Sequence, residues 1–241
     1  MKKLFLMLFF FPLAFQGMAQ APLAAKKHDI SIETFEAKLK QAGNRAQILD
    51  ARTVEEYQLN HLKGAALFSV ANETELQKQI DGLDKQRPVF VYSINNGRSV
   101  QLAKKLKEQH FQEVYDLPGG ISHWIGSGRP VESTTGQGLS LEEYKKTVQS
   151  EKLVLVDVHS KFCGGCKRLA PIVDSISREN TSGLKVVKVE LFENKTLAQE
   201  LGIESIPTLL LYKGDKVVWR KTGVTPKAQI QQAINENTGV N

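Results

Sequence analysis

The chain has 241 residues, a formal net charge of +6 and two cysteines, Cys163 and Cys166. This length exceeds the usual size of one domain and suits two domains of about 100 residues each. The positive charge is mild and contains no long run of lysine or arginine, so nucleic acid is not expected among the partners. Because the two cysteines are nearly adjacent, a framework of structural disulfides between distant segments is excluded.

Residues 1–19 have the composition of a secretory signal peptide. Two lysines precede a strongly apolar block over residues 4–15, and the small residues Gly17 and Ala19 supply a cleavage site. The block is too short to cross a bilayer as a helix, which needs roughly 20 residues. We therefore expect an exported, periplasmic protein that keeps no stable membrane anchor after cleavage. Loss of the two lysines lowers the formal charge from +6 to +4.

Residues 28–131 are expected to form a first α/β domain, in which short apolar strands alternate with amphipathic helices around a largely parallel sheet. One strand covers 48–49, and the clearest strand covers 89–92. A tight loop over 93–98 then leads into a helix. Such a loop turns backbone N–H groups inward as an anion cradle, and Arg98 at its rim adds a planar cation.

Four motifs occur in order in this domain: Leu49-Asp50-Ala51-Arg52, Glu55-Glu56-Tyr57, His61-Leu62-Lys63-Gly64-Ala65 and Leu117-Pro118-Gly119-Gly120-Ile121 followed by Trp124. Together they resemble a single-domain rhodanese over about 100 residues. The resemblance implies a parallel sheet with flanking helices and a loop that begins with a sulfur-carrying cysteine and ends with an arginine. Arg98 matches this pattern, but Ser93 stands at the cysteine position and Gly97 is displaced by one residue.

A serine hydroxyl at position 93 cannot carry a persulfide, because its pKa is far above that of a thiol and no base adjoins it in the loop. Rhodanese sulfurtransferase activity is therefore not expected. Three roles stay open for the degenerate domain: binding of small oxyanions, docking of a partner, or holding the second domain in place. The remaining alternative is a folded spacer, in which Asp50, Arg52 and His61 only satisfy loop hydrogen bonds.

Residues 132–138 are small and polar and predict a linker between the two domains. Ser140 and Glu143 form a capping-box pattern that predicts a helix reaching about Val148. A second α/β domain is expected over residues 139–238, again with a largely parallel sheet.

The stretch around Cys163 combines a buried strand over 153–156 with the start of a helix. Cysteines spaced i and i+3 at a helix N-terminus lie on one face, and the unpaired N–H groups there favour a thiolate at Cys163. A thiolate beside a second thiol is the arrangement for thiol–disulfide exchange. A zinc site is not expected, because His159 offers only a third ligand and no fourth follows. An inert pair of core thiols is the remaining alternative.

Downstream, apolar runs predict strands over 184–191 and 209–212, a hairpin turn over 213–215, a returning strand over 217–219 and a last helix over 226–234.

The second domain carries an ordered set of motifs: Val156-Asp157, Phe162-Cys163-Gly164-Gly165-Cys166-Lys167, Ala170-Pro171, Lys188, Ile206-Pro207-Thr208 and Gly223. This set resembles thioredoxin over nearly the whole domain. The resemblance implies a thioredoxin fold with a mixed central sheet, in which Cys163 is the attacking thiolate and Cys166 the resolving thiol.

The resemblance also assigns supporting residues. Asp157 matches the buried carboxylate that handles the proton of the resolving cysteine, and Lys188 matches the charge partner of that carboxylate. Pro207 matches a cis-proline facing the disulfide, where the backbone of Ile206 pairs with an extended substrate. Without the resemblance, Asp157 and Lys188 would be interpreted as structural and solvated residues.

These observations predict an exported thiol–disulfide oxidoreductase that reduces or isomerises disulfides of periplasmic proteins. The Gly164-Gly165 centre offers no side chain to stabilise the thiolate, which favours a reductase or isomerase over a strong oxidant. The expected partners are protein disulfides and a membrane electron donor, and no cofactor beyond the Cys163–Cys166 pair is expected. Two alternatives stay open: a sulfur-relay protein, and a redox-poised adaptor that docks a partner through its first domain.

Overall fold

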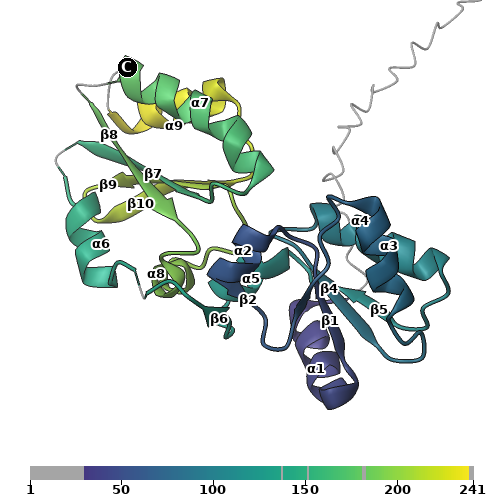
Figure 1. The fold of residues 1–241 in the computed structure, drawn as a ribbon. Helices are drawn as coiled ribbons and strands as arrows, with labels where there is room; N and C mark the ends of the chain where they lie inside the picture. Colours follow the sequence, from purple (N-terminus) through teal and green to yellow (C-terminus); the bar gives the residue numbers. More distant parts are fainter. Residues whose placement is uncertain (1–29, 137, 151, 181–182, 239–241) are drawn as a thin grey trace, which may run out of the picture.

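The computed structural model describes residues 30–136, 138–150, 152–180 and 183–238. The predicted signal peptide, residues 1–19, lies outside them. Within those ranges, no helix combines the length and apolar character needed to cross a membrane. Figure 1 shows two α/β units that lie side by side, each with its own sheet.

The first domain is built on four parallel strands in the order β3-β1-β4-β5. The strands are β1 (Gln47–Asp50), β3 (Ala66–Leu67), β4 (Val89–Tyr92) and β5 (Val114–Asp116). The helices are α1 (Ile32–Ala42), α2 (Val54–Leu59), α3 (Glu73–Asp81), α4 (Gly97–Glu108) and α5 (Gly120–Gly126), with a 3₁₀ turn, η1, at Gly43–Arg45. The predicted parallel sheet with flanking helices is confirmed.

Alternation along β4 divides the core of this domain into two layers. Val89 and Val91 face the layer under α3 and α4, whereas Phe90 and Tyr92 face the layer under α1 and α5 (Figure 1). The ring of Phe35 in α1 meets that of Phe90 edge-on, with the ring centroids 5.3 Å apart. Both faces of the sheet are therefore covered, as the fully apolar β4 sequence requires.

The second domain has a mixed sheet in the order β10-β9-β7-β8. The strands are β7 (Leu153–His159), β8 (Leu184–Glu190), β9 (Thr208–Lys213) and β10 (Lys216–Thr222). β7 is parallel to β8, but β9 is antiparallel to both β7 and β10. The largely parallel sheet predicted from strand–helix alternation is wrong here. β9 enters the sheet antiparallel to β7, and β10 then follows β9 through a tight hairpin, which makes a second antiparallel pair. The mixed sheet implied by the resemblance is confirmed.

Among the described residues, the second domain has four helices, of which α6 and α7 begin at a side-chain cap. They are α6 (Leu141–Val148), α7 (Gly164–Glu179), α8 (Lys195–Glu200) and α9 (Lys227–Thr238). The predicted capping box of α6 is present: the Ser140 hydroxyl accepts from the Glu143 N–H, and the Glu143 carboxylate accepts from the Ser140 N–H. Helices α7 and α9 pack on one face of the sheet, over a core that includes Leu155, Val173 and Ile230.

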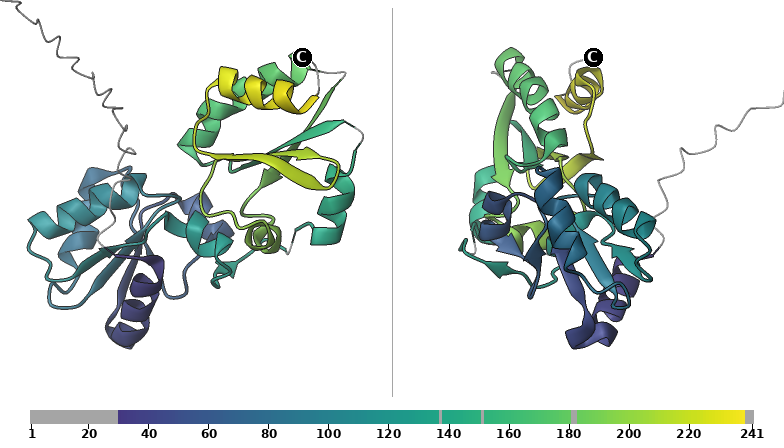
Figure 2. Two further views of the ribbon diagram at one scale, coloured as in Figure 1. Left: turned by 180° about the vertical axis from the view of Figure 1, so that it is seen from behind. Right: turned by 45° about the vertical axis from the view of Figure 1, so that its right-hand side comes forward.

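The two domains share one hydrophobic cluster through the contact of α5 with α8 (Figure 2). Ile121, Trp124 and Ile125 of the first domain join a cluster that continues into Leu197, Ile203 and Ile206 of the second. Gly126 lets the end of α5 approach the Ile203 backbone closely, since an added Cβ would lie 1.6 Å from the Ile203 carbonyl oxygen. The domains are therefore packed together.

The segment between the domains forms contacts with both of them. Its first two residues form β6 (Glu132–Ser133), which pairs antiparallel with β2 (Asn60–His61) of the first domain. The Thr135 hydroxyl donates to the carbonyl of Phe192 at 2.9 Å and accepts from Lys195 Nζ at 2.6 Å. The predicted linker over 132–138 thus includes a strand and a polar contact with the second domain.

Replacing Gly126 with alanine is expected to destabilise the protein by about 1–3 kcal/mol, because the new Cβ would meet the Ile203 backbone, which must shift to make room. Thermal unfolding should show a midpoint lower by about 2–4 °C for each kcal/mol lost. Gly97→Ala is the matched control, since a Cβ there meets no atom of the described residues within 4 Å. Equal midpoints for the two variants would contradict the close approach.

Candidate active site

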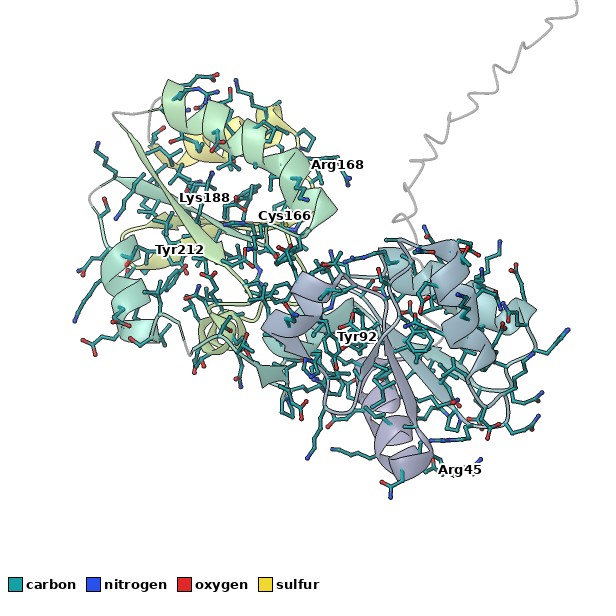
Figure 3. The ribbon with its side chains drawn as sticks, viewed as in Figure 1. Arg45, Tyr92, Cys166, Arg168, Lys188 and Tyr212 are labelled. Carbon is teal, nitrogen blue, oxygen red and sulfur yellow. The ribbon has the colours of Figure 1, made fainter. Side chains whose placement is uncertain are left out.

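Cys163 lies where β7 gives way to α7, at the N-cap of that helix. Its backbone N–H donates to the Ser160 carbonyl at 3.1 Å, and its sulfur accepts from the Cys166 N–H at 3.2 Å. Both cysteines are free thiols, with 2% of Cys163 and 4% of Cys166 exposed. In Figure 3, Cys166 lies near the end of α7 that is turned toward the first domain. The predicted placement of the pair at a helix start is confirmed.

The surroundings shift the pKa values of the two thiols in opposite directions. The pKa of Cys163 is lowered to about 7, first by the Cys166 side chain as a hydrogen-bond donor, then by the backbone N–H groups of Cys166 and Gly165 and the charge of Arg168, against the opposing effect of burial. The pKa of Cys166 is raised, first by its hydrogen bond to Cys163 and then by burial. Cys163 is therefore the thiolate and Cys166 its protonated neighbour near neutral pH.

Alkylation by iodoacetamide should distinguish the Cys163 thiolate from the protonated Cys166 thiol. The rate at Cys163 is expected to rise with pH along a single titration with a midpoint at about 7, because only the thiolate attacks and its fraction grows as pH passes the pKa. Cys166 should stay unmodified at pH 7, as peptide mass spectrometry would show. A midpoint near the ordinary cysteine value of roughly 8.5 would contradict the assignment.

Asp157 is buried on β7, the strand that precedes the cysteines, with 3% of its surface exposed. Burial raises its pKa, while the nearby charges of His159 and Lys188 act in the opposite direction. Its Oδ1 atom has no hydrogen-bond partner among the residues that the structure describes. A carboxylate with a raised pKa and a free acceptor can take a proton, and its charge in turn acts on Cys166.

Lys188 does not pair directly with Asp157. It lies opposite Asp157 in the β7–β8 register, but its Nζ binds Asp174 Oδ1 at 2.8 Å, and 45% of its side chain is exposed. Its influence on Asp157 is electrostatic only. Lys188 thus acts on Asp157 through its charge, while its ammonium group pairs with the half-exposed Asp174 on α7, where an ion pair has a lower desolvation cost than beside the buried Asp157.

Two further titratable side chains near the site were not predicted as a group. His159 and Glu190 are register partners at the ends of β7 and β8, with His159 Nδ1 3.9 Å from Glu190 Oε2. Glu190 accepts the Lys161 N–H at 3.0 Å, and burial raises its pKa. The i, i+2 spacing of Asp157 and His159 on one strand was the available signal, since it places them on one sheet face.

The predicted substrate segment lies against the cysteines. The Ile206–Pro207 peptide bond is cis, and the Cys163 sulfur is 3.6 Å from the Ile206 carbonyl oxygen. A Cβ on Gly165 would lie 3.1 Å from Pro207 Cδ, so the two loops are in close contact. The structure therefore brings Cys163, Cys166, Ile206 and Pro207 together.

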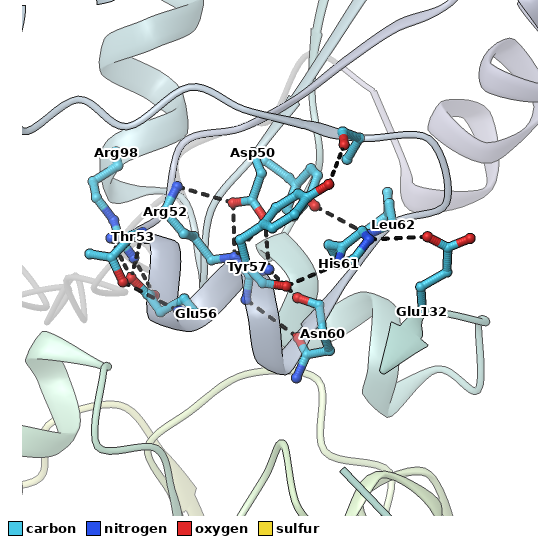
Figure 4. Close-up of polar contacts among 12 residues, drawn as sticks. Asp50, Arg52, Thr53, Glu56, Tyr57, Asn60, His61, Leu62, Arg98 and Glu132 are labelled. Atoms are coloured by element: carbon cyan, nitrogen blue, oxygen red, sulfur yellow. Dashed lines mark hydrogen bonds and ion pairs between the residues drawn. The ribbon is translucent and has the colours of Figure 1, made fainter. Parts of the chain in front are cut away.

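The loop with Ser93 and Arg98 does not join this cluster through either residue. The Ser93 hydroxyl turns into the loop, where it accepts from the Ser99 N–H at 3.3 Å and lies 3.2 Å from the Asn95 carbonyl. Arg98 forms a bidentate ion pair with buried Glu56, at 2.7 and 2.6 Å (Figure 4). The cation expected at the cradle rim is thus already neutralised within the domain.

An open groove of about 530 Å³ lies between the domains, beside the loop that leads to Cys163. It is lined by Glu55, Gln58 and Leu59 of α2, Thr134, and Lys161 and Phe162 of the active-site loop. Within this lining, the Lys161 ammonium group lies over the Phe162 ring, with its Nζ atom 4.9 Å from the ring centre. Residues of both domains therefore line this groove, and Phe162 in its wall directly precedes Cys163 in the sequence.

Comparison with known proteins agrees with this geometry. The rhodanese-like domain family model matches residues 32–127, and the thioredoxin family model matches residues 137–236. The thioredoxin of Porphyra purpurea is 37% identical over 92 residues, covering 38% of this chain and 86% of that protein. The thioredoxin of Bacillus subtilis is 39% identical over 88 residues, covering 36% of this chain and 85% of that protein.

A solved thioredoxin structure from Malassezia sympodialis (Mala s 13) has a TM-score of 0.38 and 28% identity, covering 42% of this chain and 87% of that chain. The family models and the curated relatives place the redox residues in a nearly complete thioredoxin domain. The chain belongs to the thioredoxin family, as a thiol–disulfide oxidoreductase that carries a rhodanese-like domain ahead of its redox domain.

Proposed function

We propose that this protein is exported to the periplasm and there reduces or isomerises protein disulfides. The observation that carries the proposal is the Cys163 sulfur at the start of α7, with a pKa of about 7 and a protonated Cys166 behind it. A reductant needs a ready thiolate at neutral pH, and this pKa supplies one without the extreme depression typical of strong oxidants. The composition of residues 1–19 supports export.

The exchange uses the chain's own groups at each step. The Cys163 thiolate attacks one sulfur of a substrate disulfide, forming a mixed disulfide and releasing the other sulfur as a thiolate. Asp157 takes the proton of Cys166, whose thiolate then attacks the Cys163 sulfur and releases the second substrate thiolate. The substrate gains two electrons and the protein is left with a Cys163–Cys166 disulfide. A membrane electron donor restores the dithiol, and no further cofactor is required.

The reduction potential of the mature protein tests the direction of this reaction. Equilibration with glutathione and dithiothreitol buffers is expected to give a potential close to the roughly −270 mV of thioredoxin. A value close to roughly −120 mV would make the protein an oxidant and overturn the proposal. Treatment of the reduced protein with thiosulfate distinguishes the sulfur-relay alternative, which predicts a mass gain of one sulfur at Cys163.

A further inference from the structure

The first domain holds the cis-proline segment of the second domain at two places. The Asn95 side chain donates from Nδ2 to the Ile206 carbonyl at 3.0 Å, across 111 residues of sequence. At the other end of the segment, Gly126 of α5 is seated against the Ile203 backbone. Ile203 is fully buried and only 2% of Ile206 is exposed. The loop that would pair with a substrate is therefore covered by the rhodanese-like domain.

The backbone of the loop that carries Asn95 is held in position by its own domain. The loop carbonyls of Ser93 and Ile94 accept from the N–H groups of Ile121 and Ser122, at 2.9 and 3.0 Å. Gly120 makes this fit possible, since a Cβ there would lie 2.1 Å from the Asn95 carbonyl oxygen. The loop that holds a sulfur-carrying cysteine in rhodaneses here presents an amide side chain to the redox site.

The Asn95 amide offers the same polar groups as a peptide bond. Its Nδ2 donor occupies the Ile206 carbonyl, which is the acceptor that a substrate N–H would need. Its Oδ1 atom is buried and has no partner in the described part of the chain, so the contact leaves one acceptor unsatisfied. The Cys163 sulfur is 3.6 Å from the same Ile206 carbonyl oxygen, and only 2% of Cys163 is exposed.

We propose that Asn95 is a specificity-determining residue: it occupies the Ile206 carbonyl in place of a substrate backbone, so that an extended polypeptide must displace it to reach Cys163. The inference rests on the proposed disulfide reduction and adds a role for the rhodanese-like domain. Displacement costs the hydrogen bond between Asn95 and Ile206, and only a substrate that needs the Ile206 carbonyl bears this cost. Displacement stays possible because the incoming peptide N–H replaces the lost donor and the released amide recovers water for its unsatisfied acceptor. A small disulfide that forms no backbone pairs has no need of the carbonyl.

The test compares two substrates in the full mature protein: a linear peptide carrying an interchain disulfide, and the small disulfide 5,5′-dithiobis(2-nitrobenzoate). Asn95→Ala is expected to raise the ratio of peptide kcat/KM to small-disulfide kcat/KM about fivefold, mainly through a lower peptide KM. That factor corresponds to the net value of one hydrogen bond, about 1 kcal/mol. Asn95→Asp keeps the side-chain shape and replaces the donor with an acceptor, so it should shift the ratio in the same direction.

Thr135→Val is the matched control. It removes another polar contact between the domains, that of Thr135 with Phe192, without touching the Ile206 carbonyl. Its substrate ratio should equal that of the wild type. A ratio that stays constant or falls in both Asn95 variants overturns the inference while leaving disulfide reduction intact. A wild-type protein that reduces neither substrate overturns the proposed function and this inference with it.

Discussion

Replacing Cys163 with serine is expected to lower the rate of disulfide reduction by about a thousandfold or more. The Cys163 sulfur is the nucleophile because its pKa of about 7 leaves much of it ionised at neutral pH, whereas a serine hydroxyl stays protonated. The measurement is insulin reduction by the mature protein, with dithiothreitol as the electron source. Residual activity within tenfold of wild type would remove Cys163 from the role of attacking thiolate.

Cys166→Ser separates the two thiols, because it spares the attacking group and removes the resolving one. The serine hydroxyl can still donate to the Cys163 sulfur, so the thiolate should persist. The first attack then proceeds, but the mixed disulfide accumulates, visible as an adduct on Cys163 in mass spectra. A general reductase traps many substrates in this way, whereas the adaptor alternative predicts one dominant partner. Continuous turnover by this variant would contradict the resolving role.

Elements with strong local signals could be predicted from the sequence. The Ser140–Glu143 capping box predicted α6, and the apolar run before Cys163 predicted β7. Both rest on contacts within a few residues, namely backbone capping and hydrophobic periodicity. The two cysteines were predicted for the same reason, since a helix start fixes their geometry within one turn.

The contacts that shape the site could not be predicted, because they depend on how the domains pack. Nothing local to Asn95 indicates that its amide meets Ile206, and Gly126 has no sequence signature for its contact with Ile203. Whether Lys188 pairs with Asp157 or with Asp174 depends on how deeply each carboxylate is buried, and the strand register alone does not give that burial. Sequence reasoning therefore located the chemistry but not the role of the first domain beside it.

Replacing Arg52 with methionine is expected to lower the free energy of unfolding by about 3–5 kcal/mol, a large share of typical domain stability. The Arg52 and Asp50 side chains are both fully buried, with Arg52 Nε and Nη2 donating to the Asp50 carboxylate at 2.7 to 3.0 Å (Figure 4). Removal of the guanidinium leaves the Asp50 charge buried without its partner. It also removes the Arg52 contacts with the Asn60 carbonyl and with the Phe192 ring of the second domain, 5.9 Å away.

Urea unfolding followed by circular dichroism would measure the loss, and two further variants identify its source. The double variant Asp50→Leu/Arg52→Met removes both charges and should be less destabilised than Arg52→Met alone, because no unpaired ion is left in the core. Lys40→Met disrupts an exposed ion pair with Glu36, whose Lys40 side chain is 74% exposed, and should change stability by less than about 0.5 kcal/mol. If Arg52→Met cost no more than Lys40→Met, the buried pair would contribute nothing beyond a surface contact. If instead the double variant were as destabilised as Arg52→Met, the loss would come from packing, including the contact with Phe192, and not from the stranded Asp50 charge.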